Sequence, residues 1–288
     1  MKATVAIVAM GEMGAGVGRA LVESGARVVT SLVGRSQTST ERAAKAGVEA
    51  VDDDSALVAQ ADFVLSIVPP SRAGELAERL LPKIRDAQRK PVFVECNAVA
   101  PATVKQIAVP FQAEGLPFVD AGIIGPPPAP GRPAPRFYAS GAAVGRFEEL
   151  RKFSIDVRPL SREVGDASAL KMAYGGINKG LQALGAAMIL GAVQAGVSKA
   201  LWQEMQDSQS AVLQVLVRAL PKMYAKAYRW IGEMEEIAKF LHPDTGGSEM
   251  LSGAAHVYED IARDYAGGPD NERIRLLTEF LEQSASQK

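Results

Sequence analysis

Two glycines near the start of the chain have the spacing of a pyrophosphate-binding turn. Gly11 and Gly14 follow an apolar run at 4–9 and precede a helix expected at 15–23. A glycine at position 11 lets a phosphate approach the backbone, and Gly14 lets the helix pack close to the sheet with its N-terminus toward the anion. Ala9 replaces the first glycine of the usual pattern, so an ordinary strand–helix turn is an equal alternative for the motif alone. A second apolar run at 27–33 completes a βαβ unit and favours a dinucleotide site.

The residues after the second apolar run distinguish the two nicotinamide cofactors. An acidic residue about 20 positions past the glycines would hold the NAD ribose, but Gly34 stands there. Arg35, Ser36 and the hydroxyl groups at 38–40 follow, with Arg42 near enough to help, and such groups bind the extra phosphate of NADP. A polar loop that caps the next helix is the alternative. We predict that NADP is preferred over NAD.

Lys171 is the one charged residue in the stretch 167–177. Most lysines face water, but this stretch does not have the pattern of a solvated helix face. Tyr174, Gly175 and Asn178 follow three, four and seven positions later and lie on the same side of a helix. Burial lowers the pKa of an ammonium group, so a half-buried lysine can accept a proton near neutral pH. We interpret Lys171 as a general acid/base.

The composition excludes several classes of partner. The chain has 288 residues and a net charge of −1, which provides no broad positive field for nucleic acid or an anionic membrane. Its single cysteine, Cys96, stands in an apolar run, which indicates an inert buried thiol in a reducing compartment such as the cytoplasm. The apolar stretch 180–196 is too short and too polar to span a membrane. His242 and His256 are isolated, so we expect no metal site.

The pattern of apolar runs predicts an α/β fold with two domains. Strands and helices alternate to about residue 160, which is typical of a parallel sheet covered on both faces. We therefore predict an NADP-binding Rossmann domain at 1–162, with a doubly wound sheet, and an all-helical substrate and dimerisation domain at 163–288. The proline-rich stretch 125–135 is expected to form a stiff loop, either a lid or a surface excursion. Strands are expected at 4–9, 27–33, 49–51, 62–68, 91–96 and 117–123, and helices at 15–23, 40–46, 53–59, 73–84, 101–108, 166–195, 199–220, 222–241, 248–266 and 271–283.

These pieces together resemble the β-hydroxyacid dehydrogenases, a superfamily that includes 3-hydroxyisobutyrate and 6-phosphogluconate dehydrogenases. The resemblance spans nearly the whole chain. It rests on the turn ending in Gly-x-Met-Gly, on Val68-Pro69-Pro70, on the segment 95–101 and on the segment 165–171. The C-terminal half is similar to an uncharacterised bacterial and fungal branch, with Arg-Trp-Ile-Gly-Glu-Met-Glu-Glu-Ile at 229–237 as its local signature.

The resemblance implies a nicotinamide-dependent oxidoreductase that acts on the CH–OH group of a small hydroxy compound. Lys171 matches the catalytic lysine of the family, and Asn97 matches a residue that touches both substrate and nicotinamide. Gly122 and Gly125 match glycines that let the backbone approach the substrate. The predicted cofactor residues are Met10, Gly11, Glu12, Met13, Gly14, Arg35, Ser36, Val68, Pro69, Pro70 and Asn97, and the predicted substrate residues are Asn97, Gly122, Ile123, Tyr174, Asn178, Arg229 and Glu233.

Two departures from the family limit what the resemblance implies. Gly175 stands where the family has an asparagine, and Asn178 stands where 6-phosphogluconate dehydrogenase has a glutamate that acts as a general acid. An amide cannot serve as a general acid, so phosphogluconate chemistry is disfavoured. Imine or ketimine reduction is one alternative. A cofactor-binding protein with little catalysis is another.

The helical half also carries predictions about packing. Arg229 and Glu233 are four positions apart, so they either form an ion pair or leave Arg229 to bind a substrate carboxylate. Five glycines of the helix 166–195 each cost up to about 1 kcal/mol relative to alanine, which favours close helix–helix approach. Because this helix is apolar on most sides, we predict a homodimer through the helical domain, with a monomer as the alternative. The glycines are Gly175, Gly176, Gly180, Gly185 and Gly191.

Overall fold

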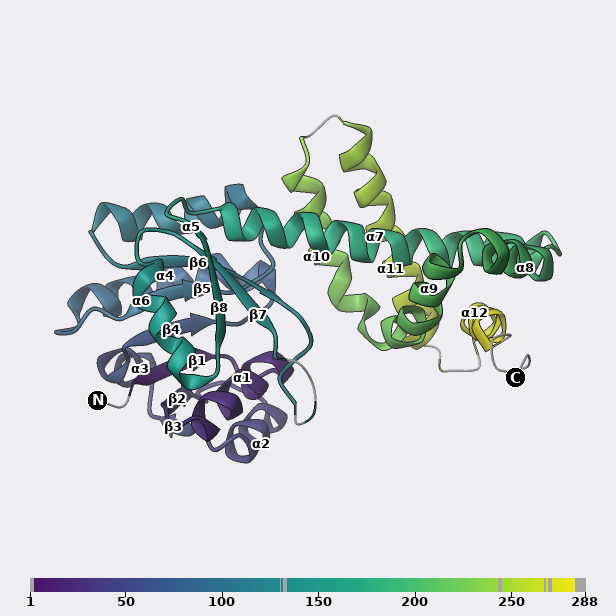
Figure 1. Cartoon of the computed structure of the whole chain (residues 1–288). Helices are drawn as coiled ribbons and strands as arrows, with labels where there is room; N and C mark the ends of the chain where they lie inside the picture. The colour runs from purple at the N-terminus through teal and green to yellow at the C-terminus, as the bar shows by residue number, and fades with distance from the viewer. Residues whose placement is uncertain are drawn as a thin grey trace. The chain divides into compact units, whose positions relative to one another are not determined.

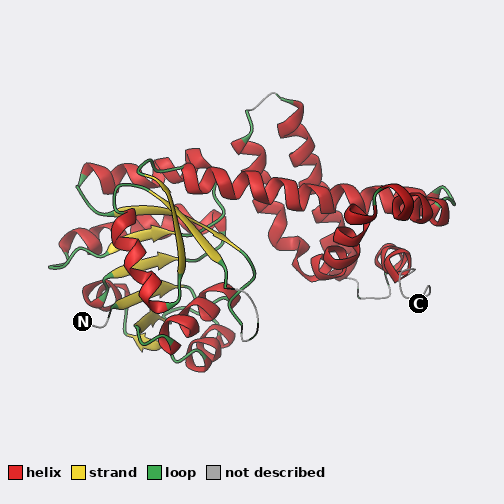
Figure 2. Ribbon diagram, in the orientation of Figure 1, coloured by secondary structure: helices red, strands yellow, loops and turns green. Residues whose placement is uncertain are grey.

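The computed structural model describes residues 3–129, 131, 134–242, 245–266, 268 and 271–282. The chain divides into two compact units, Met1–Met172 and Ala173–Lys288. Figures 1 and 2 show the strands in the first unit and a helical second unit. Among the described residues, no helix is both long and apolar enough to cross a bilayer. The same residues contain no group of three or more His, Cys, Asp or Glu side chains arranged to hold a metal ion.

The first unit is built on an eight-stranded sheet in the order β3-β2-β1-β4-β5-β6-β7-β8. All neighbouring strands are parallel except β6 and β7. The strand order reverses between β1 and β4, which is the point where doubly wound sheets bind ligands. The strands are β1 (Thr4–Val8), β2 (Arg27–Ser31), β3 (Glu49–Val51), β4 (Phe63–Ser66), β5 (Val92–Glu95), β6 (Phe118–Ile124), β7 (Arg136–Ser140) and β8 (Asp156–Ser161).

The six predicted strands are present, but β7 and β8 were missed. Both lie at one end of the sheet, where alternate side chains reach solvent. Strand β8 also contains Pro159, and proline is tolerated in a sheet mainly at an edge. Both strands mix charged and polar residues with apolar ones, so they lack the continuous apolar runs that marked most of the predicted strands. The sheet is therefore mixed rather than purely parallel.

Helices cover both faces of this sheet, and the alternation along each strand explains why. In β1, Val5 and Ile7 belong to one apolar core, while Ala6 and Val8 belong to the other. Successive side chains of a strand point to opposite faces, so two apolar faces need two layers of helices. The five predicted helices of this unit are confirmed, with a short sixth. They are α1 (Glu12–Glu23), α2 (Gln37–Lys45), α3 (Asp54–Gln60), α4 (Ala73–Asp86), α5 (Pro101–Ala113) and α6 (Val144–Phe147), with 3-10 turns η1 (Pro70–Arg72) and η2 (Glu148–Phe153).

The second unit is helical throughout its described residues. The long helix α7 begins in the first unit and continues into the second. One predicted helix at 199–220 is two helices, because the backbone leaves the helical region at Gln209 (φ −136°, ψ 37°). The elements are α7 (Asp166–Gln194), α8 (Ser198–Ser208), α9 (Ser210–Met223), η3 (Tyr224–Lys226), α10 (Ala227–Phe240), α11 (Gly246–Ala266) and α12 (Glu272–Glu282).

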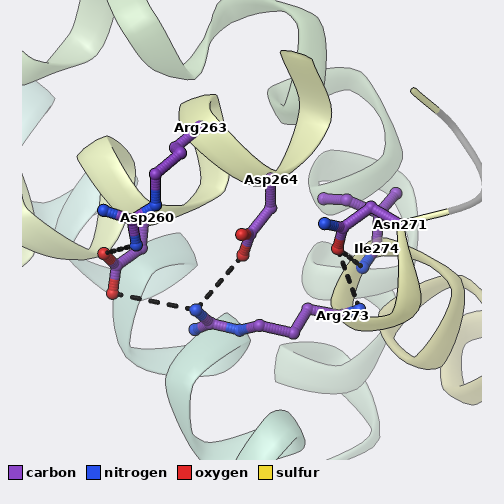
Figure 3. A network of polar contacts seen from close by, with 6 residues as sticks. All are labelled: Asp260, Arg263, Asp264, Asn271, Arg273 and Ile274. Carbon is purple, nitrogen blue, oxygen red and sulfur yellow. Dashed lines mark hydrogen bonds and ion pairs between the residues drawn. The ribbon is translucent and has the colours of Figure 1, made fainter. Parts of the chain in front are cut away.

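Ion pairs and a cap fix the start of α12 (Figure 3). Asn271 Oδ1 accepts from the backbone N–H of Arg273 at 3.0 Å and of Ile274 at 3.4 Å, which caps the helix. The Arg273 guanidinium lies 3.2 Å from Asp264 and 3.9 Å from Asp260, both on α11. These contacts link α11 to α12, although exposed ion pairs of this kind each contribute less than about 1 kcal/mol.

Four of the five glycines in α7 lie at close helix–helix contacts, as predicted. A Cβ on Gly176 would lie 3.1 Å from Ile237 of α10, and one on Gly185 would lie 2.5 Å from Leu216 of α9. A Cβ on Gly175 would lie 3.4 Å from Ile237 of α10, and one on Gly180 would lie 3.7 Å from Leu251 of α11. The prediction is wrong for Gly191, because a Cβ there would meet nothing within 4 Å in the described chain.

Candidate active site

The glycine turn places the N-terminus of α1 at the carboxyl end of β1. Gly11 is the N-cap of α1, and no side chain of the described structure caps this helix. The first backbone N–H groups of an uncapped helix, together with its dipole, favour an anion. A Cβ on Gly11 would meet nothing within 4 Å, so the space beside it is open. A Cβ on Gly14 would overlap the carbonyl group of Ala9, so this glycine allows the predicted close approach of the helix.

The proline-rich segment after β6 lies against the same helix. A Cβ on Gly16 would lie 2.9 Å from Pro128, and Arg19 Nη2 donates to the Pro128 carbonyl at 2.9 Å. A pocket of about 250 Å³ lies between α1, the C-terminal end of α2 and this segment. It is lined by Glu12, Ala15, Gly16, Arg19, Arg42, Lys45, Ala46 and Pro128. Three cations against one acid favour an anionic ligand. Residues 130, 132 and 133 of the predicted stiff loop lie outside the described chain.

The loop between β2 and α2 contains the residues predicted to select NADP. Strand β2 ends at Ser31, and Gly34 adopts a positive φ of 68° that a side chain would disfavour. Ser36 is the N-cap of α2, and its hydroxyl accepts from the Ser39 N–H at 3.3 Å. Ser36 therefore caps α2, which is the role that the sequence offered for this loop as the alternative to binding a phosphate. Arg35 is half-exposed beside it.

A row of buried polar residues crosses four strands at the carboxyl edge of β4 and β5. Ser66, Glu95, Asp120 and Ser140 are successive register partners on β4, β5, β6 and β7, and each is at most 1% exposed. We call these four residues the polar row. Paired positions of neighbouring strands place their side chains on the same face, so the four side chains lie side by side.

Asp120 of the polar row anchors the first turn of α7. Its Oδ2 accepts from the N–H groups of Gly165 and Ser168, both at 3.0 Å, and from Ser140 Oγ at 3.1 Å. Its Oδ1 accepts from Ser168 Oγ at 2.7 Å. Ser140 Oγ in turn accepts from the Ala167 N–H at 3.1 Å. The orphan N–H groups that begin α7 are thus bound by the sheet, which fixes where the helix starts.

Lys171 lies one helical turn beyond this anchor, against β6. A Cβ on Gly122 would lie 2.9 Å from the Ala167 carbonyl oxygen and 3.1 Å from the Lys171 Cβ, so only glycine permits this approach. Lys171 is half-buried. Burial raises the pKa of the neighbouring Cys96 thiol, as do the charges of Glu95 and Asp120, whereas the Lys171 ammonium lowers it. Lys171 and the two acids therefore lie close enough to Cys96 to act on the same group.

Asn97 connects the ends of β4 and β5. Its Oδ1 accepts from the Val68 N–H at 2.7 Å, its Nδ2 donates to Ser66 Oγ at 2.8 Å, and its backbone N–H donates to Glu95 Oε1 at 2.9 Å. The side chain is 5% exposed. These bonds join Val68 and Asn97, two residues predicted to contact the cofactor. The Oδ1 atom retains capacity for one further hydrogen bond.

Comparisons with known proteins agree with this architecture. Residues 4–141 match the NAD binding domain of 6-phosphogluconate dehydrogenase, and residues 192–261 match a domain of unknown function, DUF1932. A conserved protein whose structure was found to be similar to 3-hydroxyacid dehydrogenases is 25% identical, with a TM-score of 0.67 over 90% of this chain and 98% of that chain. In both matched segments the chain is similar to proteins of the 6-phosphogluconate dehydrogenase-like superfamily.

Two further relatives fit this assignment. The 3-hydroxyisobutyrate dehydrogenase of Mycobacterium tuberculosis shares the fold, with a TM-score of 0.72 at 18% identity over 97% of this chain and 99% of that chain. An uncharacterised 28.5 kDa protein of Methanothermus fervidus is 28% identical over 217 residues, which is 74% of this chain and 81% of the relative. The resemblance predicted from the sequence is therefore confirmed at the level of the superfamily.

Four of the predicted substrate residues lie in the second unit. Tyr174 is 51% exposed, and Asn178 Oδ1 accepts from Gln182 Nε2 at 3.2 Å within α7. Glu233 of α10 forms an ion pair with Lys179 of α7. The Lys179 ammonium also lies 5.2 Å from the centre of the Trp230 ring, a distance at which a cation–π attraction acts. Arg229 is exposed.

The sequence did not identify four polar residues that the structure places in these contacts: Glu95 and Asp120 of the polar row, Ser168, which binds Asp120, and Lys179, which pairs with Glu233. A signal was available for the two acids, since each is a single charge inside an apolar run, as Lys171 is. Burial raises the pKa of the Asp120 carboxyl above its ordinary value and raises that of Glu95 to about 7. Lys179 lacked such a signal, because a lysine beside an asparagine and a glycine usually faces water.

Proposed function

We propose that this protein is an NADP-dependent oxidoreductase that transfers a hydride between the nicotinamide and a β-hydroxy acid or a related small hydroxy or keto compound. The observation that carries the proposal is the position of Lys171. Its helix is anchored to β6 through Asp120, and Gly122 leaves room for the lysine beside the sheet. The glycine turn lies in the same unit, at the carboxyl end of β1. The first unit therefore contains both the proposed cofactor site and Lys171, an amine that can exchange a proton.

The residues present fit a dinucleotide. The uncapped N-terminus of α1 and the open space at Gly11 suit a pyrophosphate, and the Asn97 bond to the Val68 N–H orders the segment proposed to lie along the cofactor. When bound, the nicotinamide would accept the hydride during oxidation and donate it during reduction. Lys171 Nζ, as a neutral amine, takes the proton of the substrate hydroxyl during oxidation. As an ammonium it returns that proton during reduction.

The residues proposed to contact the substrate fall into two groups along the chain. Of the predicted substrate residues, Gly122 lies beside Lys171, whereas the side chain of its neighbour Ile123 is buried in the apolar core on the other face of the sheet. Asn97 lies at the end of β5, and Tyr174 and Asn178 follow Lys171 on α7. Arg229 is proposed to bind the substrate carboxylate, because a guanidinium donates two parallel hydrogen bonds to that group. Glu233, which forms an ion pair with Lys179, is also proposed to contact the substrate.

Imine reduction is the second candidate. An imine reductase from Myxococcus stipitatus in complex with NADP⁺ has a TM-score of 0.55 at 21% identity over 97% of this chain and 99% of that chain. A variant of that enzyme is in complex with NAD⁺. A cofactor-binding protein with little catalysis is a third candidate, because Gly175 and Asn178 remove two groups that the superfamily uses.

A panel of substrates separates these candidates. The protein is assayed with NADP⁺ and a series of β-hydroxy acids, and with NADPH and the matching keto acids and cyclic imines. We expect oxidation of at least one hydroxy acid. Turnover of imines alone would support the imine reductase. Binding of NADPH, followed by its fluorescence, without turnover of any compound would support the third candidate.

We expect NADPH to bind at least tenfold more tightly than NADH. An arginine that binds a phosphate through two hydrogen bonds contributes about 1.5 to 3 kcal/mol. Arg35→Ala should therefore remove most of the preference by weakening NADPH binding without changing NADH binding. Titration calorimetry with both cofactors measures this, and Arg146→Ala, on the short helix α6, serves as the control. Equal affinities in the unmutated protein would contradict the proposed role of Arg35.

We also propose that the protein is a homodimer through its helical unit. On α7, Ile177, Leu184 and Met188 are 76%, 60% and 60% exposed, and half-buried Leu181 lies between them. Their spacing of four, three and four is the heptad spacing of a helix seam that packs against another helix. A second copy of α7 has the same seam, so a two-fold axis between the copies would bury the apolar side chains of both.

A further inference from the structure

We infer that the neighbouring carboxyl groups of Glu95 and Asp120 hold one proton between them in the folded protein, and that Glu95 carries it. The two residues are direct register partners on the parallel strands β5 and β6. Neighbouring strands lie about 4.8 Å apart, and paired side chains share one face of the sheet. Both residues are 1% exposed, so water does not screen their mutual repulsion. Two adjacent buried carboxyl groups rarely ionise together, because like charges disfavour the second ionisation.

The hydrogen bonds decide which carboxyl group is ionised. Asp120 accepts four hydrogen bonds, from Ser140 Oγ, from the N–H groups of Gly165 and Ser168, and from Ser168 Oγ. It also lies at the N-terminus of α7, whose dipole stabilises a negative charge. Glu95 Oε1 accepts from the Asn97 N–H, and the side chains of Ser66 and Asn97 also favour the ionised form. Its buried Oε2 has no hydrogen-bond partner among the described residues, whereas both oxygens of Asp120 accept. The charge therefore belongs on Asp120 and the proton on Glu95.

The groups around Glu95 support this assignment. Ser66 of β4 and Asn97 beside it carry no charge, and their hydrogen bonds to Glu95 only partly oppose the effect of its burial. Burial raises the pKa of Cys96 well above its ordinary value, and Asp120 is the charged group acting from β6. From α7, the positive charge of Lys171 lowers the pKa of Cys96, the residue next to Glu95 in the chain. Burial raises the pKa of Glu95 to about 7, and the Asp120 charge adds to that shift.

The proton on Glu95 has a consequence for Lys171, and this step rests on the proposed function. If Glu95 were ionised, a second negative charge would lie near the lysine and raise its pKa, so that it would remain an ammonium and a poorer base. Below a pH of about 7 the neutral Glu95 limits the polar row to one negative charge, and above that pH Glu95 adds a second. Glu95 is thus a positioning residue, which acts through Asn97 and Lys171 rather than on the substrate.

Infrared spectroscopy of the unmodified protein tests the inference directly. A protonated carboxyl group has a C=O stretching band that a carboxylate lacks. We expect a band that remains well above pH 5 and disappears with a midpoint near 7, matching the pKa of Glu95. Glu95→Gln should remove this band, whereas Glu78→Gln, the same change on the exposed face of α4, should leave it. A band absent at pH 6, or one that is kept in Glu95→Gln and lost in Asp120→Asn, would overturn the assignment.

Thermal unfolding gives a second readout that needs no catalysis. The folded state holds the Glu95 proton up to a pH of about 7, whereas the unfolded state releases it near the ordinary value of 4.5. The contribution to stability is therefore complete below 4.5 and is lost as the pH rises to 7. Glu95→Gln cannot ionise, so its Tm should rise relative to the unmodified protein by on the order of 5 °C between pH 5 and 8. A difference that does not change with pH would refute the inference.

The pH profile of turnover links the proton to Lys171. Above a pH of about 7, Glu95→Gln lacks the negative charge that Glu95 acquires, so the acidic limb of kcat/KM should lie at lower pH than in Glu78→Gln. If no compound is turned over, the proposed function fails, while the infrared and unfolding results still decide the location of the proton. An unchanged acidic limb in an active Glu95→Gln protein would show that Glu95 does not act through Lys171.

Discussion

Lys171→Ala is expected to lower kcat by about two to four orders of magnitude, the range that a positioned general acid/base contributes. The substitution removes the amine that exchanges the hydroxyl proton. It leaves in place the anchor of α7, because the bonds to Asp120 come from Gly165 and Ser168. The dissociation constant of NADPH should therefore change little. Steady-state kinetics on the best substrate of the panel, together with cofactor titration, measures both quantities.

The matched control for this experiment is Lys152→Ala, which removes an exposed lysine of the same unit. Full activity in Lys171→Ala would exclude the lysine from the mechanism. A loss of activity accompanied by an equal loss of NADPH binding would assign Lys171 to the cofactor site instead.

Met188→Glu is expected to convert a dimer into a monomer. The unmodified protein should sediment at twice the 30.5 kDa mass of one chain. In the proposed seam Met188 lies against the partner helix, and burying an unpaired carboxylate there is strongly unfavourable. The variant should sediment at 30.5 kDa at micromolar concentration, which corresponds to a dissociation constant raised at least a hundredfold.

A matched methionine separates the seam from a general effect of charge. Met250 lies on α11 and is 68% exposed, compared with 60% for Met188, so Met250→Glu makes the same change outside the seam. That variant should remain a dimer. A monomeric unmodified protein would refute the dimer. A dimer that persists in Met188→Glu would place the interface on another surface.

The sequence predicted the features that depend on local patterns. The alternation of apolar residues determined the six strands and both apolar faces of the sheet. The spacing of Gly11 and Gly14 predicted the turn into α1. The same local logic selected Lys171, because one charge in an apolar helix can be recognised without knowing what surrounds it. It also predicted close helix contacts at Gly176 and Gly185, since glycine in a helix is unfavourable unless packing requires it.

Where local patterns were weak, the prediction failed. The last two strands of the sheet, β7 and the edge strand β8, are held by pairing with each other and with β6, so their residues need little intrinsic strand preference. The break at Gln209 was missed for a similar reason, because the apolar spacing of α8 and α9 continues through it. Gly191 has the same composition around it as the other glycines, but a Cβ there would meet no atom of the described residues within 4 Å.

The polar clusters were decided only by the tertiary structure. The carboxylate of Asp120 meets the N–H groups of Gly165 and Ser168, which are 45 and 48 positions away, and Lys179 meets Glu233 at a separation of 54. Glu95 and Asp120 become neighbours through the register of two parallel strands joined by α5. A sequence states which residues carry charge, but burial, register and hydrogen bonding set the protonation of a carboxyl group. These are properties of the folded chain, and they determine which of two acids keeps its proton.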